Sequence, residues 1–186
     1  ASPTGTAGLA GVLAVRDQWA QAKYDTPKDQ RVAALEALAT KASAARAAHP
    51  EAADALIWEG IVLSTLAGEK GGLGALGLVK QARKRFEQAI AIDPAALNGS
   101  AYTSLGSLYY QVPGWPIGFG DDKKARELLA TALTLNPDGI DPNYFLGDFL
   151  YRKGDYAGAR NALDRALRAA PRPDRPLADE GRRKEI

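Results

Sequence analysis

Residues 140–171 read IDPNYFLGDFLYRKGDYAGARNALDRALRAAP. Two patterns of helical period lie on either side of Gly154. Four residues of the first pattern share one stripe of a helix: Asn143, Leu146, Gly147 and Leu150. The second pattern ends at Pro171, and proline cannot continue the hydrogen-bond ladder of a helix. This segment therefore predicts two helices joined by a short turn at Gly154.

Both patterns occur three times along the chain. The second pattern repeats with spacings of 4, 3 and 5 residues in Ala82, Phe86, Ala89 and Pro94, in Ala125, Leu129, Ala132 and Pro137, and in Ala159, Leu163, Ala166 and Pro171. The first pattern repeats in Leu56, Glu59, Gly60 and Leu63 and in Tyr102, Leu105, Gly106 and Tyr109. Repeats of this length indicate stacked helix pairs that bury one continuous core.

Each first helix carries a glycine within its packing stripe, at positions 60, 106 and 147. A glycine in the middle of a helix costs about 1 kcal/mol relative to alanine, so it needs a structural reason. We expect the second helix of each pair to approach closely at these three glycines.

These residues resemble the tetratricopeptide repeat family, most closely in the last repeat. That repeat has Leu146-Gly147, Gly154 at the turn and Pro171 at the end, but Asn143 stands where the family typically has tryptophan. The resemblance implies an all-α fold. More closely, it implies an α-solenoid of helix-turn-helix repeats, with about eight helices in a right-handed superhelix.

The same spacings predict the domain organisation. We expect a flexible N-terminal segment, a repeat domain and a charged tail or capping helix, at residues 1–7, 8–171 and 172–186. Within the repeat domain we expect a degenerate helix pair and three repeats, at residues 8–50, 53–94, 98–137 and 140–171. Leu177 to Ile186 offers little apolar surface, so a firm contact with the core is not expected.

Composition excludes several classes of site. The chain has no cysteine, one histidine and a net charge of +2, which argues against thiolate or multi-histidine metal sites and against nucleic acid as a partner. Residues 72–77 match G-x-G-x-x-G, but a dinucleotide site needs a preceding strand, and the pattern here is helical. No catalytic frame is visible. We therefore predict no enzyme activity, no metal, no cofactor and no membrane-spanning segment.

The resemblance implies a concave face lined by the first helices of the repeats. The residues expected on it lie one position beyond the packing stripe: Ile57, Ile61, Thr65, Thr103, Ser107, Tyr110, Gln111, Tyr144, Asp148, Tyr151 and Arg152. A turn insertion, residues 112–120, carries Trp115, Ile117 and Phe119. These apolar side chains either cover a gap between helices or contact a ligand. We expect Trp115 or Phe119 near Tyr110 and Tyr144.

The function predicted from these features is binding of a protein or peptide partner in the groove. One alternative is a periplasmic component that binds a small hydrophobic molecule, similar to the T-component proteins of TRAP transporters. The other is a structural homo-oligomer. The small residues that open the chain are typical of a mature secreted protein. They predict a bacterial periplasmic or secreted location, with a membrane anchor before trimming as a further option.

Overall fold

A computed structural model describes residues 9–186, so the predicted segment 1–7 lies outside the described residues. Those residues form nine helices and no strand, with one isolated backbone bridge between Gly114 and Gly120. The predicted all-α helical-repeat fold is therefore confirmed. The chain divides into two compact units that meet between Asp93 and Pro94. Whether the repeats form a right-handed superhelix depends on how the two units are placed relative to each other, so the superhelix stays a prediction.

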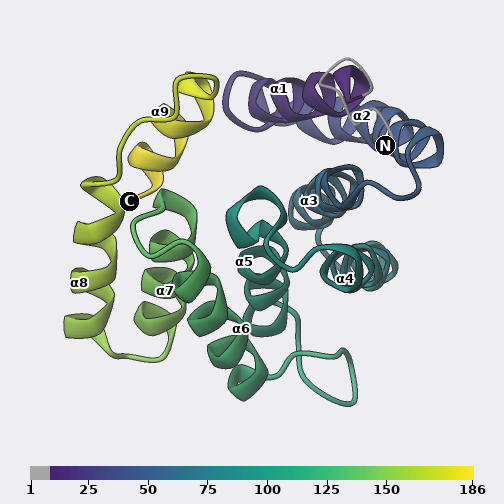
Figure 1. Ribbon diagram of the computed structural model, residues 1–186. Coiled ribbons are helices and arrows are strands. Elements are labelled where there is room, and N and C mark those ends of the chain that lie inside the picture. Colours follow the sequence, from purple (N-terminus) through teal and green to yellow (C-terminus); the bar gives the residue numbers. More distant parts are fainter. Residues whose placement is uncertain (1–8) are drawn as a thin grey trace. The chain divides into compact units, whose positions relative to one another are not determined.

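The first unit contains two helix pairs (Figure 1). Its helices are α1 (Ala10–Tyr24), α2 (Lys28–Ala48), α3 (Ala53–Lys70) and α4 (Gly74–Ile92). Helix α3 contacts the other three helices and is buried along most of its length. A polar side chain on such a buried helix needs a hydrogen-bond or ionic partner within the same unit. Glu59 of α3 does so by forming ion pairs with Arg46 of α2 and Arg85 of α4.

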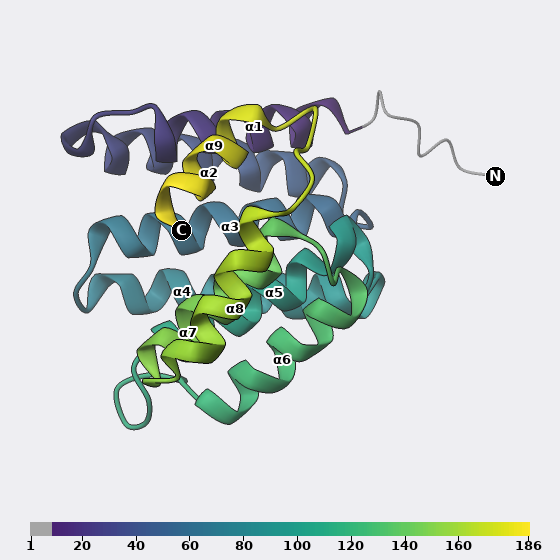
Figure 2. The ribbon, with the colours of Figure 1, turned by 90° about the vertical axis from the view of Figure 1, so that its left-hand side faces the viewer.

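The second unit contains five helices (Figure 2). They are α5 (Ala96–Gln111), α6 (Asp122–Leu135), α7 (Ile140–Arg152), α8 (Tyr156–Leu167) and α9 (Pro176–Glu185). Helices α5 and α6 form one pair, α7 and α8 form the next, and α7 also contacts α5, α6 and α9. The turn between α7 and α8 needs only a few residues because Gly154 adopts a φ of +80°.

The close approach expected at the three repeat glycines is confirmed. A Cβ atom on Gly60 would lie 2.5 Å from the Phe86 ring, and one on Gly147 would lie 2.6 Å from Leu163 Cδ2. At Gly106 the nearest atom would be Leu129 Cγ, at 3.0 Å. In each repeat, the glycine of the first pattern contacts the large apolar residue of the second pattern. The two sequence patterns therefore describe the two sides of the same contact between helices.

The glycine-rich run at residues 72–77 is divided between a turn and a helix. Helix α4 begins at Gly74, so only residues 71–73 connect it to α3. Gly71 and Gly72 both have positive φ and make the turn, while Gly74 and Gly77 lie in the first turns of the helix. Helix α4 has 19 residues, whereas α6 has 14 and α8 has 12. The first repeat is therefore longer mainly because its second helix is longer.

The C-terminal segment is a helix, one of the two forms expected for it, but its contact with the core is firmer than expected. It forms α9, whose residues Ala178, Asp179, Gly181 and Arg182 are buried. Ile186 packs against the small apolar cluster of Ile140, Ala166 and Ala169. The expectation of a weak contact was wrong because it counted apolar residues only, whereas charged side chains hold this helix in place.

Helix α5 begins with an irregular turn. Leu97 and Asn98 have φ values of 50° and 55°, which is uncommon for residues that carry a side chain. Gly99 follows with a φ of 78°, and the Ser100 hydroxyl donates a hydrogen bond to the Leu97 carbonyl at 2.6 Å. A Cβ atom on Gly99 would lie 2.9 Å from Leu135 Cδ1. The start of α5 is therefore fixed against the end of α6.

No helix within residues 9–186 has both the length and the hydropathy that crossing a bilayer requires.

Candidate interaction surface

Four of the residues expected on the concave face come together between α5 and α7. The Tyr110 hydroxyl donates a hydrogen bond to Asp148 Oδ2 at 2.7 Å, and Arg152 Nε donates to the same oxygen at 3.1 Å. The Arg152 guanidinium also lies over the Tyr110 ring, 5.5 Å from its centroid. Gln111 Nε2 lies 3.4 Å from the Tyr110 hydroxyl oxygen. The four side chains form one polar cluster on the second unit, which we call the α5–α7 cluster.

Tyr110 is a stable hydrogen-bond donor in this cluster. Burial of its ring, and then the neighbouring Asp148 carboxylate, raise the pKa of Tyr110 above its usual range. The phenol therefore stays protonated throughout the physiological pH range and keeps donating to Asp148. In consequence, Asp148 Oδ2 accepts hydrogen bonds from both the Tyr110 hydroxyl and Arg152 Nε across this range.

Two other expected residues of α5 do not reach this surface. Thr103 and Ser107 are buried. The Ser107 hydroxyl donates to the Ser104 carbonyl at 2.7 Å, and the Thr103 hydroxyl lies 3.5 Å from the Gly99 carbonyl. Hydroxyl side chains within helices commonly bond to a preceding carbonyl in this way. They therefore satisfy the backbone of α5 and are closed to a ligand.

Most of the concave-face residues expected in the first unit are buried or already contact other side chains of that unit. Ile57 is fully buried, and Ile61 is half-buried. The Thr65 hydroxyl accepts a hydrogen bond from Trp19 Nε1 at 2.9 Å, which ties α3 to α1. Sequence spacing assigns residues to a helical face, but it does not show which other side chains cover that face.

Helix α9 covers the expected ligand residue Tyr144. The Arg182 guanidinium lies 4.4 Å from the centroid of the Tyr144 ring and 4.8 Å from that of Phe145. Tyr144 is only partly exposed, whereas Tyr151 at the end of α7 is exposed and meets the Tyr156 ring edge to face. The open part of the α7 surface is therefore its C-terminal end.

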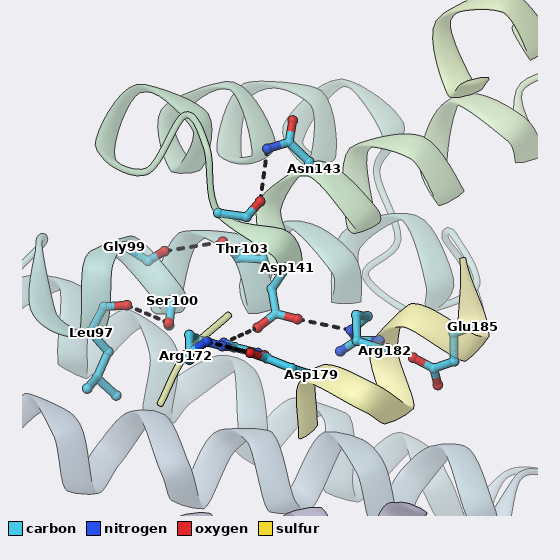
Figure 3. A network of polar contacts seen from close by, with 11 residues as sticks. Leu97, Gly99, Ser100, Thr103, Asp141, Asn143, Arg172, Asp179, Arg182 and Glu185 are labelled. Atoms are coloured by element: carbon cyan, nitrogen blue, oxygen red, sulfur yellow. Dashed lines mark hydrogen bonds and ion pairs between the residues drawn. The ribbon is translucent and has the colours of Figure 1, made fainter. Parts of the chain in front are cut away.

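An ion network attaches α9 to α7, and the sequence analysis missed it (Figure 3). Asp141 accepts hydrogen bonds from Arg172 Nη1 and Arg182 Nε, both at 2.9 Å. Asp179 accepts from the backbone N–H of Arg172 at 2.6 Å and from its Nε at 2.7 Å. The many charged residues of the tail indicated that ion pairs could form there. Their partner Asp141 could not be identified from the sequence, because it lies on α7, 31 residues before Arg172.

Asn143 has a structural role in place of the typical tryptophan. It is fully buried, and its amide nitrogen donates to the carbonyls of Pro137 and Gly139, each at 2.9 Å. Its side-chain oxygen accepts from Arg165 Nε at 3.0 Å. Asn143 thus connects the α6–α7 turn with α8, and it is not available to a partner.

The insertion between α5 and α6 forms a closed loop that projects from the two helices (Figure 1). Phe119 packs against Tyr109, with ring centroids 5.4 Å apart. The prediction placed Trp115 or Phe119 near Tyr110 and Tyr144, whereas the ring that Phe119 contacts belongs to Tyr109, whose side chain points about 100° away from that of Tyr110. Trp115 is 90% exposed and Ile117 is 60% exposed, so neither covers a gap between helices.

Gly120→Ala is expected to open this loop. A Cβ atom at position 120 would lie 1.9 Å from the Val112 carbonyl oxygen, which belongs to the backbone and cannot rotate away. We expect faster amide hydrogen exchange at Asp121, whose N–H now bonds to the Tyr109 carbonyl, and faster proteolysis between residues 112 and 121. Gly114→Ala is the matched control, because its nearest contact would be an ordinary 3.5 Å. Equal exchange in the two variants would contradict the close approach.

Comparison with known proteins agrees with the helical-repeat pattern. Residues 117–179 match a family model described as tetratricopeptide repeat. Among solved structures, the crystal structure of MamA is 17% identical, with a TM-score of 0.39 over 76% of this chain and 92% of that chain. No curated protein matches the chain. The second unit, from the end of the insertion loop to the start of α9, is thus similar to the tetratricopeptide repeat.

Proposed function

We propose that the chain is a non-enzymatic interaction module that holds a protein or peptide partner against the α5–α7 cluster. The repeat match in the second unit supports this proposal, since helical repeats of this type expose extended surfaces suited to binding. The exposed C-terminal end of α7, with Tyr151 and Arg152, would form the centre of the contact.

The observation that carries the proposal is the position of Arg152. Its Nε donates to Asp148 and its guanidinium lies over the Tyr110 ring, while about half of the side chain stays exposed. Its Nη groups are therefore open to a partner. A guanidinium that is already oriented loses less conformational entropy when it forms a paired contact with a carboxylate or a backbone carbonyl.

Tyr151 adds the apolar part of the same surface. Aromatic residues and arginine are the side chains that most often dominate the energy of a protein interface. Tyr151 follows Asp148 by three residues, so the two side chains are neighbours on the surface of α7. The partner we propose therefore presents an acidic or carbonyl group next to an apolar side chain.

Photocrosslinking in cells that express the natural protein tests this proposal. With a benzophenone amino acid at Tyr151, we expect a discrete adduct with a second protein, and adding Arg152→Ala should weaken it severalfold. The control position is Arg160, which is also exposed but lies on α8. A discrete adduct of the same size from Arg160, or none from Tyr151, would refute the proposed surface. An adduct with a second copy of the chain would favour the homo-oligomer.

A further inference from the structure

Helix α9 contacts α7 mainly through the side chain of Arg182. Among the buried residues of α9 it is the long side chain, and the others are small or short: Ala178, Asp179 and Gly181. The Arg182 guanidinium lies over two rings of α7, 4.4 Å from the centroid of Tyr144 and 4.8 Å from that of Phe145. Tyr144 is one of the residues that the sequence placed on the binding face, so α9 occupies part of that face itself.

The site on α7 matches the chemistry of an arginine side chain. Arg182 Nε donates to Asp141 Oδ1 at 2.9 Å, while the guanidinium lies over the two aromatic rings. The Asp141 carboxylate lies between Arg182 and Arg172, and Arg172 Nη1 donates to its other oxygen at 2.9 Å (Figure 3). A planar cation with several N–H donors suits such a site, whereas a lysine ammonium has no plane to lay on a ring. We call Asp141, Tyr144 and Phe145 the α7 arginine site.

Helix α9 has the properties of an element that opens locally. It has ten residues, and isolated helices shorter than about 12–15 residues are marginal in water, so its helical form depends on docking. Six of the ten are charged, and Gly181 in the middle lowers the helix propensity further. Ile186 adds a small apolar contact with Ile140. Contacts that are mainly ionic weaken with salt, and such segments open at free energies below that of global unfolding.

We propose that the α7 arginine site binds an arginine side chain of a partner protein, and that α9 occupies it as an internal ligand until that partner displaces the helix. The charge at the site determines the kind of partner, because the Asp141 carboxylate beside the two rings attracts a cation and repels an acidic segment. Tyr144 lies one turn before Asp148, so the site adjoins the α5–α7 cluster but shares no residue with it. The inference is therefore separate from the contact proposed at Arg152.

A peptide with the sequence of residues 176–186 tests the site in trans. It is titrated into the isotope-labelled full chain carrying Arg182→Glu, in which a second carboxylate faces Asp141 and repels α9 from the site. We expect the amide resonances of Tyr144 and Phe145 to shift with peptide concentration. The wild type should bind the peptide at least about tenfold more weakly, because its own α9, tethered by residues 168–175, competes at an effective concentration on the order of millimolar.

Two altered peptides show whether the site recognises arginine. The Arg182→Lys peptide keeps the charge but loses the planar group, so it should bind at least about tenfold more weakly. The Lys184→Ala peptide is the control and should bind like the parent, since Lys184 is exposed and pairs with Glu180 of the same helix. Equal binding of the arginine and lysine peptides would overturn the proposal.

Hydrogen exchange over residues 176–185 shows whether α9 has left the site in the Arg182→Glu chain, and circular dichroism shows that the other helices are folded. The proposal is also overturned if α9 keeps its protection in this variant, because Arg182 would then not hold it. The same holds if the released chain does not bind the peptide, or if the wild type binds it equally well. In either case α9 would be a structural cap and not an internal ligand.

Discussion

Asp141→Asn is expected to cost roughly 3 kcal/mol and to release α9 from α7. The carboxylate is the shared partner of Arg172 and Arg182, and the Arg182 side chain is only 6% exposed. Asparagine keeps the size of the side chain but removes the charge, so Arg172 keeps Asp179 and Arg182 keeps Glu185 as a carboxylate partner, but both lose the one that they share. Breaking a buried ion pair from one side typically costs about 3–5 kcal/mol. Because Asp141 is 27% exposed, we expect the lower end of that range.

Hydrogen exchange over residues 176–185 measures this effect locally. The amides of α9 should lose protection in the Asp141→Asn variant while those of α5 and α6 keep it. Asp164→Asn is the control, since Asp164 and its partner Arg160 are both exposed and such pairs contribute little. If α9 keeps its protection in the Asp141 variant, the network does not hold the helix.

The same network predicts a dependence on pH. Burial alone would raise the pKa of Asp141, but the guanidinium groups of Arg182 and Arg172 lower it well below its usual range. The group therefore stabilises the folded state fully above its unfolded pKa of about 4, and this contribution is lost as the pH falls towards the folded pKa. The protection factors of α9 should be constant from neutral pH to about 4 and then decrease, a step that Asp141→Asn should lack.

Gly60→Ala is expected to destabilise the first unit by about 3 kcal/mol, the upper end of the range for overpacking a core. The new methyl group would lie 2.5 Å from the Phe86 ring, and Phe86 is fully buried, so the ring has no free space to move into. Helices α3 and α4 would have to separate. Urea unfolding followed by circular dichroism measures the change in the free energy of unfolding.

Gly68→Ala in the same helix is the matched control. A Cβ atom at position 68 would meet nothing within 4 Å. Alanine is favoured over glycine in a helix by about 1 kcal/mol, so this variant should be slightly more stable than the wild type. A similar loss in both variants would mean that helix propensity, and not contact with Phe86, explains the glycine at position 60.

The sequence by itself determined the helices and the contacts within each repeat. Gly60, Gly106 and Gly147 meet Phe86, Leu129 and Leu163, as the two spacing patterns predicted. This was possible because helical period fixes which residues share a face, and a short turn forces consecutive helices to lie antiparallel. Both are local properties of the chain, so they can be inferred from neighbouring residues alone.

The tertiary structure alone decided which of these faces are open. Tyr144 was expected to contact a ligand, but Arg182 of α9 covers it, and Phe119 packs on Tyr109 where Tyr110 was expected. The attachment of α9 depends on Asp141, 31 residues before Arg172 and 41 before Arg182. Opposite charges can pair whatever their separation in the sequence, so the spacing of residues along the chain does not show which carboxylate pairs with which arginine. The position of α9 therefore follows from electrostatic contacts between distant residues, which become defined only when the chain is folded.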